Sequence, residues 1–259
     1  MATPAVLRAA YAAQQAAIVD WLRRLPSAAA DQPSRLSGWT LQQLAFHTTE
    51  VPRALTAALG AAPPVERAMS IGAYTARWRE FAGQIEQRDR DGAGGLTLTA
   101  IAERHEVEGA AMMAALEAVP ADRVVAARRG PIRAIDMLTT RVNELVVHSL
   151  DLSASVPQLD PVAIDPRALG VSCRMLAAIL AERAPGRSVE VRVPPYAAVQ
   201  CVEGPRHTRG TPANVVEIEP VTWVELATGR VAWGAALAAG GLQVSGERAD
   251  LTALLPVLS

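Results

Sequence analysis

The stretch Arg141-Val-Asn-Glu-Leu-Val-Val-His-Ser-Leu-Asp151 combines an apolar helical pattern with two side chains that can bind a metal. An α-helix advances about 100° per residue, so Glu144 and His148, four positions apart, lie on one face. Arg141 and Asp151 lie near the same stripe, and apolar residues fill the opposite side. A carboxylate and an imidazole that project together from a mostly apolar helix supply half of a metal site.

This Glu–His pair alone does not establish a site, because such pairs are common on helix surfaces. With 16 glutamates and four histidines among 259 residues, the spacing also arises by chance. A third ligand must come from elsewhere, and the remaining histidines are His47, His105 and His207. His47 follows a predicted helix start, since Thr40 and Gln43 form a capping-box pattern. His105 stands in a densely charged stretch, which favours a solvated helix face.

Length and composition place the chain among globular proteins of one large or two ordinary domains. Half of the residues are hydrophobic, and the formal net charge of −1 gives no electrostatic basis for binding nucleic acid. No apolar run reaches the roughly eighteen residues of a membrane helix, and the N-terminus shows no signal-peptide pattern. We therefore expect a cytoplasmic protein without membrane insertion, and the sequence leaves its oligomeric state open.

The basic and sulfur-containing residues narrow the chemistry further. All 25 basic residues other than histidine are arginines, which excludes Schiff-base and P-loop lysines. Arginine must therefore supply any cationic recognition of an anion. Cys173 and Cys201 are isolated and form no CxxC motif, which fits two free thiols in a reducing compartment.

Helical patterns dominate the first 155 residues. Pro52 lies inside one predicted helix and should kink or break it, and residues 91–95 indicate a loop. Long helices with short connections predict a bundle. Apolar residues at helical spacing place the helices at 7–25, 41–59, 71–88, 99–116 and 132–153.

The pattern changes after residue 155. Residues 156–161 indicate a linker, and Asp165-Pro166 starts a helix that extends to about residue 184. The sequence thus predicts an all-helical domain over 1–155 and a mixed α and β domain over 160–259. Within the second domain, strands are expected at 188–193, 197–203, 214–217 and 242–245, and helices at 220–226, 233–238 and 247–255.

Two motifs in the helical half resemble a known family. Ser37-Gly-Trp-Thr40, with His47 eight residues after the tryptophan, precedes Arg141-x-x-Glu144-x-x-x-His148-x-x-Asp151. Together they resemble the mycothiol-dependent maleylpyruvate isomerase family over roughly residues 5 to 155. The resemblance implies a DinB-like, metal-binding four-helix bundle. It also implies a divalent metal, usually zinc, bound by His47, Glu144 and His148.

The second half resembles a bacterial sterol-carrier-like domain. This resemblance implies a smaller α+β domain with a twisted sheet and helices, which in many relatives encloses an apolar cavity. In the isomerase family a domain of this kind covers the metal site and can contribute an arginine to it. The resemblance is carried by Val191-Arg-Val-Pro-Pro-Tyr-Ala-Ala-Val199, Gly204-Pro-Arg-His-Thr-Arg-Gly-Thr-Pro212 and Pro220-Val-Thr-Trp-Val-Glu-Leu-Ala-Thr-Gly229.

The implied set of ligands has a defined chemistry. Three protein ligands leave a fourth position open, as in catalytic zinc sites. A thiol bound there would lose its proton near neutral pH and become a nucleophile. Because Cys173 and Cys201 are distant from the motifs in sequence, we expect the thiol to be a small cosubstrate such as mycothiol. Its thiolate could isomerise an activated double bond or be transferred to the substrate.

Further polar residues are candidates for supporting roles. Asp151 could accept the second ring proton of His148, or it could be an ordinary acid at a helix end. Arg141 is expected to pair with Glu144 or Asp151, and recognition of a substrate carboxylate is the alternative. A Gly/Pro loop gathers three residues that could bind an anionic substrate or the thiol, or could form a solvated loop, namely Arg206, His207 and Arg209.

Three functions fit these patterns. The favoured one is a metal-dependent isomerase or transferase that uses a low-molecular-weight thiol on a small anionic substrate. The alternative is a lipid or small-molecule carrier, in which the second domain functions and the metal site is vestigial or structural. A scaffold without turnover is the third, and it predicts no bound metal. The sequence names no substrate and does not choose among zinc, nickel, manganese and iron.

Overall fold

The computed structural model describes residues 2–204 and 213–258. The chain divides into two compact units, Ala2–Ala168 and the part from Leu169 onward. The division falls within one helix, α7 (Pro166–Arg183). No helix in the described ranges has the length and apolar character needed to cross a membrane.

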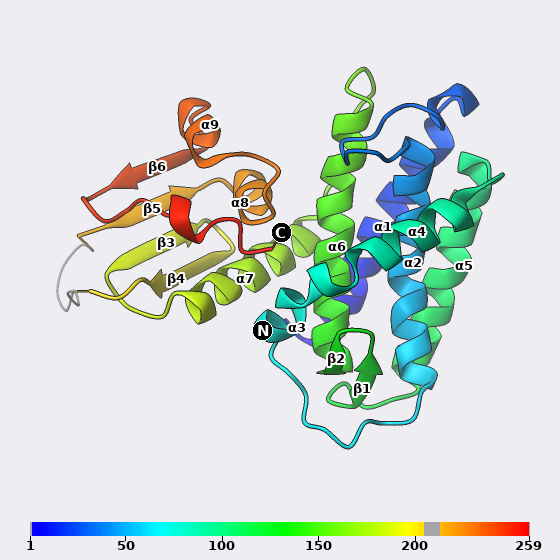
Figure 1. Ribbon diagram of the computed structural model, residues 1–259, viewed down its shortest axis with the longest axis horizontal. Coiled ribbons are helices and arrows are strands. Elements are labelled where there is room, and N and C mark those ends of the chain that lie inside the picture. Colours follow the sequence, from blue (N-terminus) through cyan, green and yellow to red (C-terminus); the bar gives the residue numbers. More distant parts are fainter. Residues whose placement is uncertain (1, 205–212, 259) are drawn as a thin grey trace. The chain divides into compact units, whose positions relative to one another are not determined.

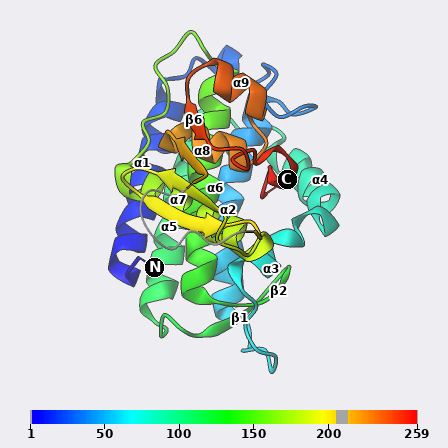
Figure 2. The same cartoon turned by 90° about the vertical axis from the view of Figure 1, so that its left-hand side faces the viewer.

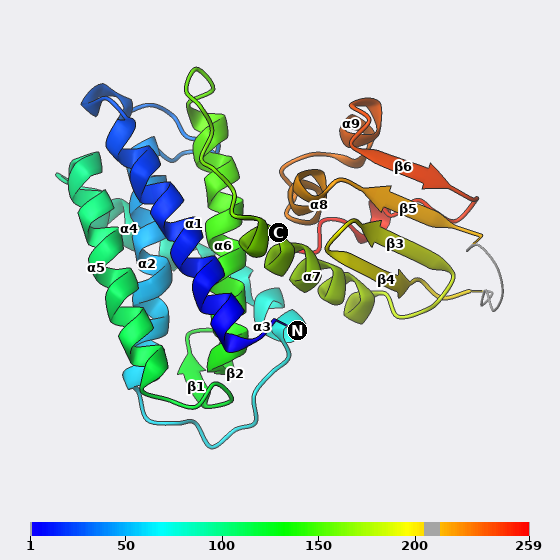
Figure 3. The same ribbon diagram turned by 180° about the vertical axis from the view of Figure 1, so that it is seen from behind.

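Four long helices build the first unit, and Figures 1 and 3 show them from opposite sides. They are α1 (Pro4–Arg24), α2 (Leu41–Gly60), α5 (Leu98–Glu117) and α6 (Ala134–Ser155). Threonine side chains cap the first three, and α2 has the complete capping box that its sequence predicts. The predicted helical bundle is therefore confirmed. Its fully buried core includes Tyr11, Ile18, Trp21, Leu44, Leu55, Ile101, Met112 and Val142.

Pro52 does not interrupt α2, which is assigned as one helix from Leu41 to Gly60. A proline inside a helix removes one backbone hydrogen bond and crowds the preceding turn. Here α2 packs against both α5 and α6, and Val51, Pro52 and Leu55 are buried. Tertiary packing of this kind contributes more to helix stability than local propensity does. The helix consequently continues through a residue that disfavours it.

The single helix expected over 71–88 is wrong. The segment forms α3 (Ile71–Ala76), a 3-10 turn at Trp78–Glu80 and α4 (Ala82–Ala93). Arg77 and Phe81 are the residues that separate these segments, and ψ is near zero at both. The loop expected from residue 91 is also wrong, because α4 continues to Ala93. A side chain at Gly92 would collide with the Phe46 ring of α2, so the glycine permits close packing.

A short antiparallel hairpin precedes α6, and the sequence patterns did not predict it. It joins β1 (Val124–Ala127) to β2 (Gly130–Arg133), with Ala127 opposite Gly130 and a two-residue turn between them. The turn consists of Arg128 and Arg129, and Gly130 has a φ of 128°. Figure 1 shows the hairpin at the end of the bundle where α6 begins. Its second strand leads directly into the helix that contains the candidate ligands.

The segment expected to link two domains is held against the bundle. The indole Nε1 of Trp21 donates to the carbonyl oxygen of Asp160 at 2.9 Å, and Gln14 contacts Ala163 and Asp165. Val156 and Val162 are buried. This part of the chain therefore packs as part of the first unit instead of forming an extended linker.

The second unit is a four-stranded sheet with helices, and Figures 1 and 2 show it from two directions, with all four strands labelled in Figure 1. Its order is β4 (Ala197–Cys201), β3 (Val189–Val193), β5 (Val215–Ile218), β6 (Leu242–Ser245). β3 and β5 are parallel, and the outer pairs are antiparallel. Helices α8 (Pro220–Ala227) and α9 (Trp233–Ala238) connect β5 to β6. Buried Trp223 donates to the carbonyl oxygen of Cys173 in α7 at 3.2 Å. The predicted α+β fold is confirmed.

The final helix expected over 247–255 is wrong, because only a 3-10 turn forms at Thr252–Leu254. Asp250 accepts hydrogen bonds from the backbone and hydroxyl of Thr252, which favours a local turn. Ala249 and Leu251 are both buried and Asp250 between them is exposed, an alternation typical of extended backbone. Pro256 also disfavours helical geometry at the residue before it.

Candidate metal centre

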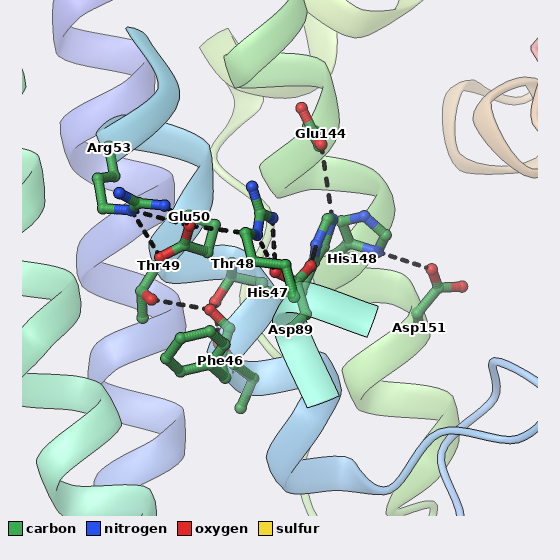
Figure 4. Close-up of polar contacts among 12 residues, drawn as sticks. Phe46, His47, Thr48, Thr49, Glu50, Arg53, Asp89, Glu144, His148 and Asp151 are labelled. Atoms are coloured by element: carbon green, nitrogen blue, oxygen red, sulfur yellow. Dashed lines mark hydrogen bonds and ion pairs between the residues drawn. The ribbon is translucent and has the colours of Figure 1, made fainter. Parts of the chain in front are cut away.

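Two helices of the first unit bring the three predicted ligands together. α6 places Glu144 and His148 on one face, one turn apart, and α2 places His47 opposite them. One ligand atom from each residue lies within 4.8 Å of the other two. The imidazole rings meet edge to face with centroids 4.8 Å apart. Figure 4 shows the three side chains pointing toward one another. The cluster thus has the donor types and the proximity of a zinc-like site.

Each histidine is held by a carboxylate through its Nδ1 atom. His47 Nδ1 lies 2.6 Å from Asp89 Oδ2, and His148 Nδ1 lies 3.1 Å from Asp151 Oδ2. Both aspartates are completely buried. In metal sites, a carboxylate bound to one ring nitrogen fixes the tautomer and directs the other nitrogen to the metal. The Nε2 atoms are therefore the expected ligands, and His47 Nε2 lies 3.5 Å from Glu144 Oε1.

The electrostatics of the cluster favour a cation between these groups. Burial has the largest effect on the pKa of His47 and lowers it, but hydrogen bonds to Asp89 and Glu144 outweigh it and raise the pKa to about 9. Burial also raises the pKa of Glu144, yet the charge of Arg141 and the His47 hydrogen bond hold that pKa well below its usual range. A protonated imidazole thus sits between two carboxylates. A metal ion bound here would replace that proton.

Arg141 pairs with Glu144, and its guanidinium lies 2.9 Å from the carboxylate. This pair is one of the alternatives expected from the sequence. Both residues lie one turn apart on α6, so the pair orients Glu144 from its own helix. Asp151 contacts His148 and also lies 3.9 Å from the Arg35 guanidinium. Asp151 therefore lies within hydrogen-bond distance of the imidazole, as the expected orienting role requires.

Asp89 is a residue of the site that the sequence patterns did not predict. It lies on α4 between two arginines, in a stretch whose charges suggest an exposed surface. Arg88 contacts Asp89 and also lies 3.4 Å from Glu50, which is buried and binds Arg53 and Arg104. This network joins α4 to α2 and holds Asp89 beneath His47 (Figure 4). No local periodicity distinguishes such a buried acid from its exposed neighbours.

The remaining candidates from the sequence are His105 and the group Arg206, His207 and Arg209. The solvated helix face expected for His105 is wrong, because its side chain is completely buried in α5. Among the described residues neither of its ring nitrogens has a hydrogen-bond partner. Arg206, His207 and Arg209, expected to bind an anionic ligand, lie outside the described residues. His105 is not one of the three residues that form the ligand cluster.

A cavity of about 330 Å³ adjoins the ligands within the first unit. His47 and Glu144 form part of its wall, together with residues of α2, α4, α6 and the β1–β2 hairpin. Trp39 lies edge-on to His47, with ring centroids 5.7 Å apart. A volume of this order holds a small molecule and matches the lower range of ligand pockets. His47 and Glu144 therefore face a space large enough for a small substrate.

Replacing Asp89 with asparagine is expected to weaken metal binding by roughly 10- to 100-fold, because the neutral amide no longer stabilises the metal-bound imidazole of His47. Competition against a chelator of known affinity measures the effect. Asp91→Asn is the matched control, since Asp91 is an exposed acid two residues further along α4. Equal metal affinities for the two variants would contradict the positioning role of Asp89.

Both halves of the chain match models of known protein families. Residues 11–153 match the family model described as the mycothiol maleylpyruvate isomerase N-terminal domain, and residues 165–257 match a model described as a bacterial SCP ortholog. No curated protein matches the chain.

Two crystal structures, of the mycothiol-dependent maleylpyruvate isomerase and of a histidine-to-alanine mutant, share the fold. Each is 17% identical with a TM-score of 0.59, and each alignment covers 93% of this chain and 92% of that chain. At this identity the likeness establishes the fold alone. The family model, by contrast, covers more than half of the chain, and the protein therefore belongs to the mycothiol maleylpyruvate isomerase N-terminal domain family.

Proposed function

We propose that this protein is a divalent-metal-dependent enzyme that uses a low-molecular-weight thiol, such as mycothiol, on a small anionic substrate. The reaction class is isomerisation or thiol transfer. The observation that carries the proposal is the convergence of His47, Glu144 and His148, with both imidazoles oriented by buried aspartates. Family membership supports the same chemistry, since the family is named for a mycothiol-dependent isomerase.

The donor set suits zinc. Two imidazoles and one carboxylate are ligands typical of catalytic zinc sites, where a fourth position stays open. When bound there, the metal supplies a position at which a thiol loses its proton near neutral pH. The chain supplies the remaining features: Asp89 and Asp151 hold the two imidazoles, Arg141 holds Glu144, and the adjoining cavity receives the substrate.

The reactive thiol is not one of the protein's own cysteines. Cys173 and Cys201 both lie buried in the second unit. Burial raises the pKa of Cys173 to about 12 and that of Cys201 to about 11, so both remain protonated at neutral pH. A protonated thiol is a poor nucleophile. An external thiol is therefore required, and a cytoplasm, which keeps such thiols reduced, is the compartment that fits this chemistry.

An isomerisation by this route leaves the thiol unchanged. The thiolate sulfur forms a bond to one carbon of a double bond conjugated to a carbonyl, and the electron pair moves to the carbonyl oxygen. Rotation about the resulting single bond follows. The pair then returns, the carbon–sulfur bond breaks and the thiolate leaves. In a transferase the carbon–sulfur bond instead persists, and a proton completes the product.

The test replaces the metal with Co²⁺ and adds mycothiol. A thiolate bound to cobalt gives an intense near-ultraviolet charge-transfer absorption, which a thiol that stays in solution does not give. We expect this absorption to rise with mycothiol to saturation, and to be absent when the same thiol carries an S-methyl group. A cobalt-loaded protein that shows no change with mycothiol would contradict the thiol-dependent function.

The second candidate is a carrier of lipid or another small apolar molecule. The observation that favours it is the match of residues 165–257 to a bacterial SCP ortholog. We propose residues 160–259 as the sterol-carrier-like domain and 1–155 as the metal-binding domain. Mass spectrometry of the intact protein under native conditions distinguishes the two functions, because a carrier retains a stoichiometric lipid that denaturation releases.

A further inference from the structure

The cavity beside the metal ligands is unusually rich in arginine. Five arginines belong to its wall, whereas the carboxylates in that wall are Glu50 and Glu144. Since the chain contains no lysine, arginine is its means of binding an anion at this place. The arginines come from α2, α4, α6 and the hairpin turn, namely Arg53, Arg88, Arg128, Arg129 and Arg141.

Three of these arginines are already neutralised within the protein. Arg53 binds Glu50, Arg88 contacts Asp89, and Arg141 pairs with Glu144. Arg128 and Arg129, which form the turn of the hairpin, have no acidic partner within ion-pair distance among the described residues. Of the two, Arg128 is exposed to solvent and Arg129 is half-buried. Arg129 is therefore the cavity arginine that is partly buried and has no acidic partner within ion-pair distance among the described residues.

Arg129 is also held in a fixed position. Its guanidinium lies over the ring of buried Tyr74, 5.3 Å from the ring centroid. Its backbone carbonyl oxygen accepts a hydrogen bond from Arg77 at 2.7 Å. The hairpin is fastened at its base, where the backbone of Ala134 donates to Arg123 at 2.8 Å. A preorganised guanidinium loses less conformational entropy when it binds a ligand than a mobile one does.

The surroundings of Arg129 make its charge costly without a ligand. Burial lowers the pKa of Arg129, and the charge of Arg141 lowers it further, which the charge of Glu144 offsets only in part. A partly desolvated charge without a partner is unfavourable, and an anion bound beside it removes that cost. Guanidinium groups bind carboxylates through two parallel hydrogen bonds, a geometry that also fixes the orientation of the ligand.

We propose that Arg129 is the specificity-determining residue of the cavity and binds the carboxylate of a small anionic substrate. The residues that line the site all lie within the first unit, and Arg129 is in the turn of the hairpin. Identification of the anion as the substrate rests on the proposed function. Binding of the anion by Arg129 does not rest on it, because Arg129 lines the cavity and is not one of the candidate metal ligands.

Titration calorimetry with malonate tests the proposal, and neutral malonamide of the same shape serves as the control ligand. The protein is first freed of metal with a chelator, so that malonate cannot bind through a metal ion. Wild-type protein is expected to bind malonate and not malonamide. Loss of a charge-assisted hydrogen bond in Arg129→Gln is expected to weaken malonate binding roughly tenfold or more. Arg128→Gln, at the exposed neighbour, is the matched control and should change the affinity less than threefold.

The outcomes separate this inference from the proposed function. Equal malonate affinities for wild type and Arg129→Gln, or no malonate binding by wild type, would overturn the role of Arg129 even if the protein holds one metal per chain. Malonate binding that depends on Arg129 in a protein that never binds metal would support the anion site and reject the proposed enzyme. If Arg129→Gln does not fold, Arg129→Lys takes its place, since it keeps the charge but lacks the planar fork.

Discussion

Replacing His148 with alanine is expected to remove the metal from the protein and with it the thiol-dependent activity. His148 supplies one of three protein ligands, and its loss leaves His47 and Glu144, which do not enclose an ion. The affinity should fall by more than the roughly 100-fold attributed to the groups that orient a ligand, because a ligand itself is lost. Elemental mass spectrometry of the purified protein should find about one metal per chain in the wild type and almost none in the variant.

Two further variants test whether the metal is lost because one of its ligands is removed. Glu144→Gln keeps the size of the side chain but removes its charge and should also lose the metal. His105→Leu removes a histidine of the same unit that the structure places outside the cluster, and it should retain the metal. Wild-type protein that stays metal-free even after zinc is added would reject the enzyme and leave the carrier function. Retention of metal by His148→Ala would instead show that other residues bind it.

The fold and the ligands differ in how far sequence alone could predict them. Glu144 and His148 were predictable from their spacing, because one helical turn places them together wherever the helix lies. His47 is almost a hundred residues earlier on a different helix, and no local pattern connects it to them. Only the resemblance to a family joined it to the pair. The orienting aspartates show the same division, since Asp151 is on the helix of its histidine and Asp89 is not.

The errors have different physical causes, and one of them is that tertiary contacts outweigh local signals. The charged sequence around Arg128 and Arg129 does not predict a hairpin, yet these two residues form its turn. Hydrogen bonds with neighbouring segments stabilise the hairpin. His105 was assigned to solvent because of its charged neighbours. The helical period contradicts that assignment, since Ile101, His105 and Met112 are spaced along one buried face of α5. Spacing predicted burial better than composition did.

The burial of His105 has a measurable consequence for stability in acid. Burial lowers the pKa of His105 to about 4 from the value of 6.5 expected in the unfolded chain, and the smaller effects that raise the pKa offset this only in part. Between these two values the unfolded state binds a proton and the folded state does not. The free energy of unfolding therefore decreases as the pH falls through 6.5, and the loss levels off below about 4.

Comparison of the wild type with His105→Leu isolates this effect. Leucine does not titrate and leaves no buried polar atom without a partner, whereas both ring nitrogens of His105 lack one among the described residues. Between pH 7.5 and pH 5 the wild type should lose about 2 kcal/mol more stability than the variant, as the difference between the two pKa values requires. Urea denaturation of both proteins, freed of metal so that the ligand cluster contributes equally, measures the difference. Parallel loss of stability in the two proteins would mean that His105 is not the buried neutral group that this geometry requires, and that acid acts elsewhere in the bundle.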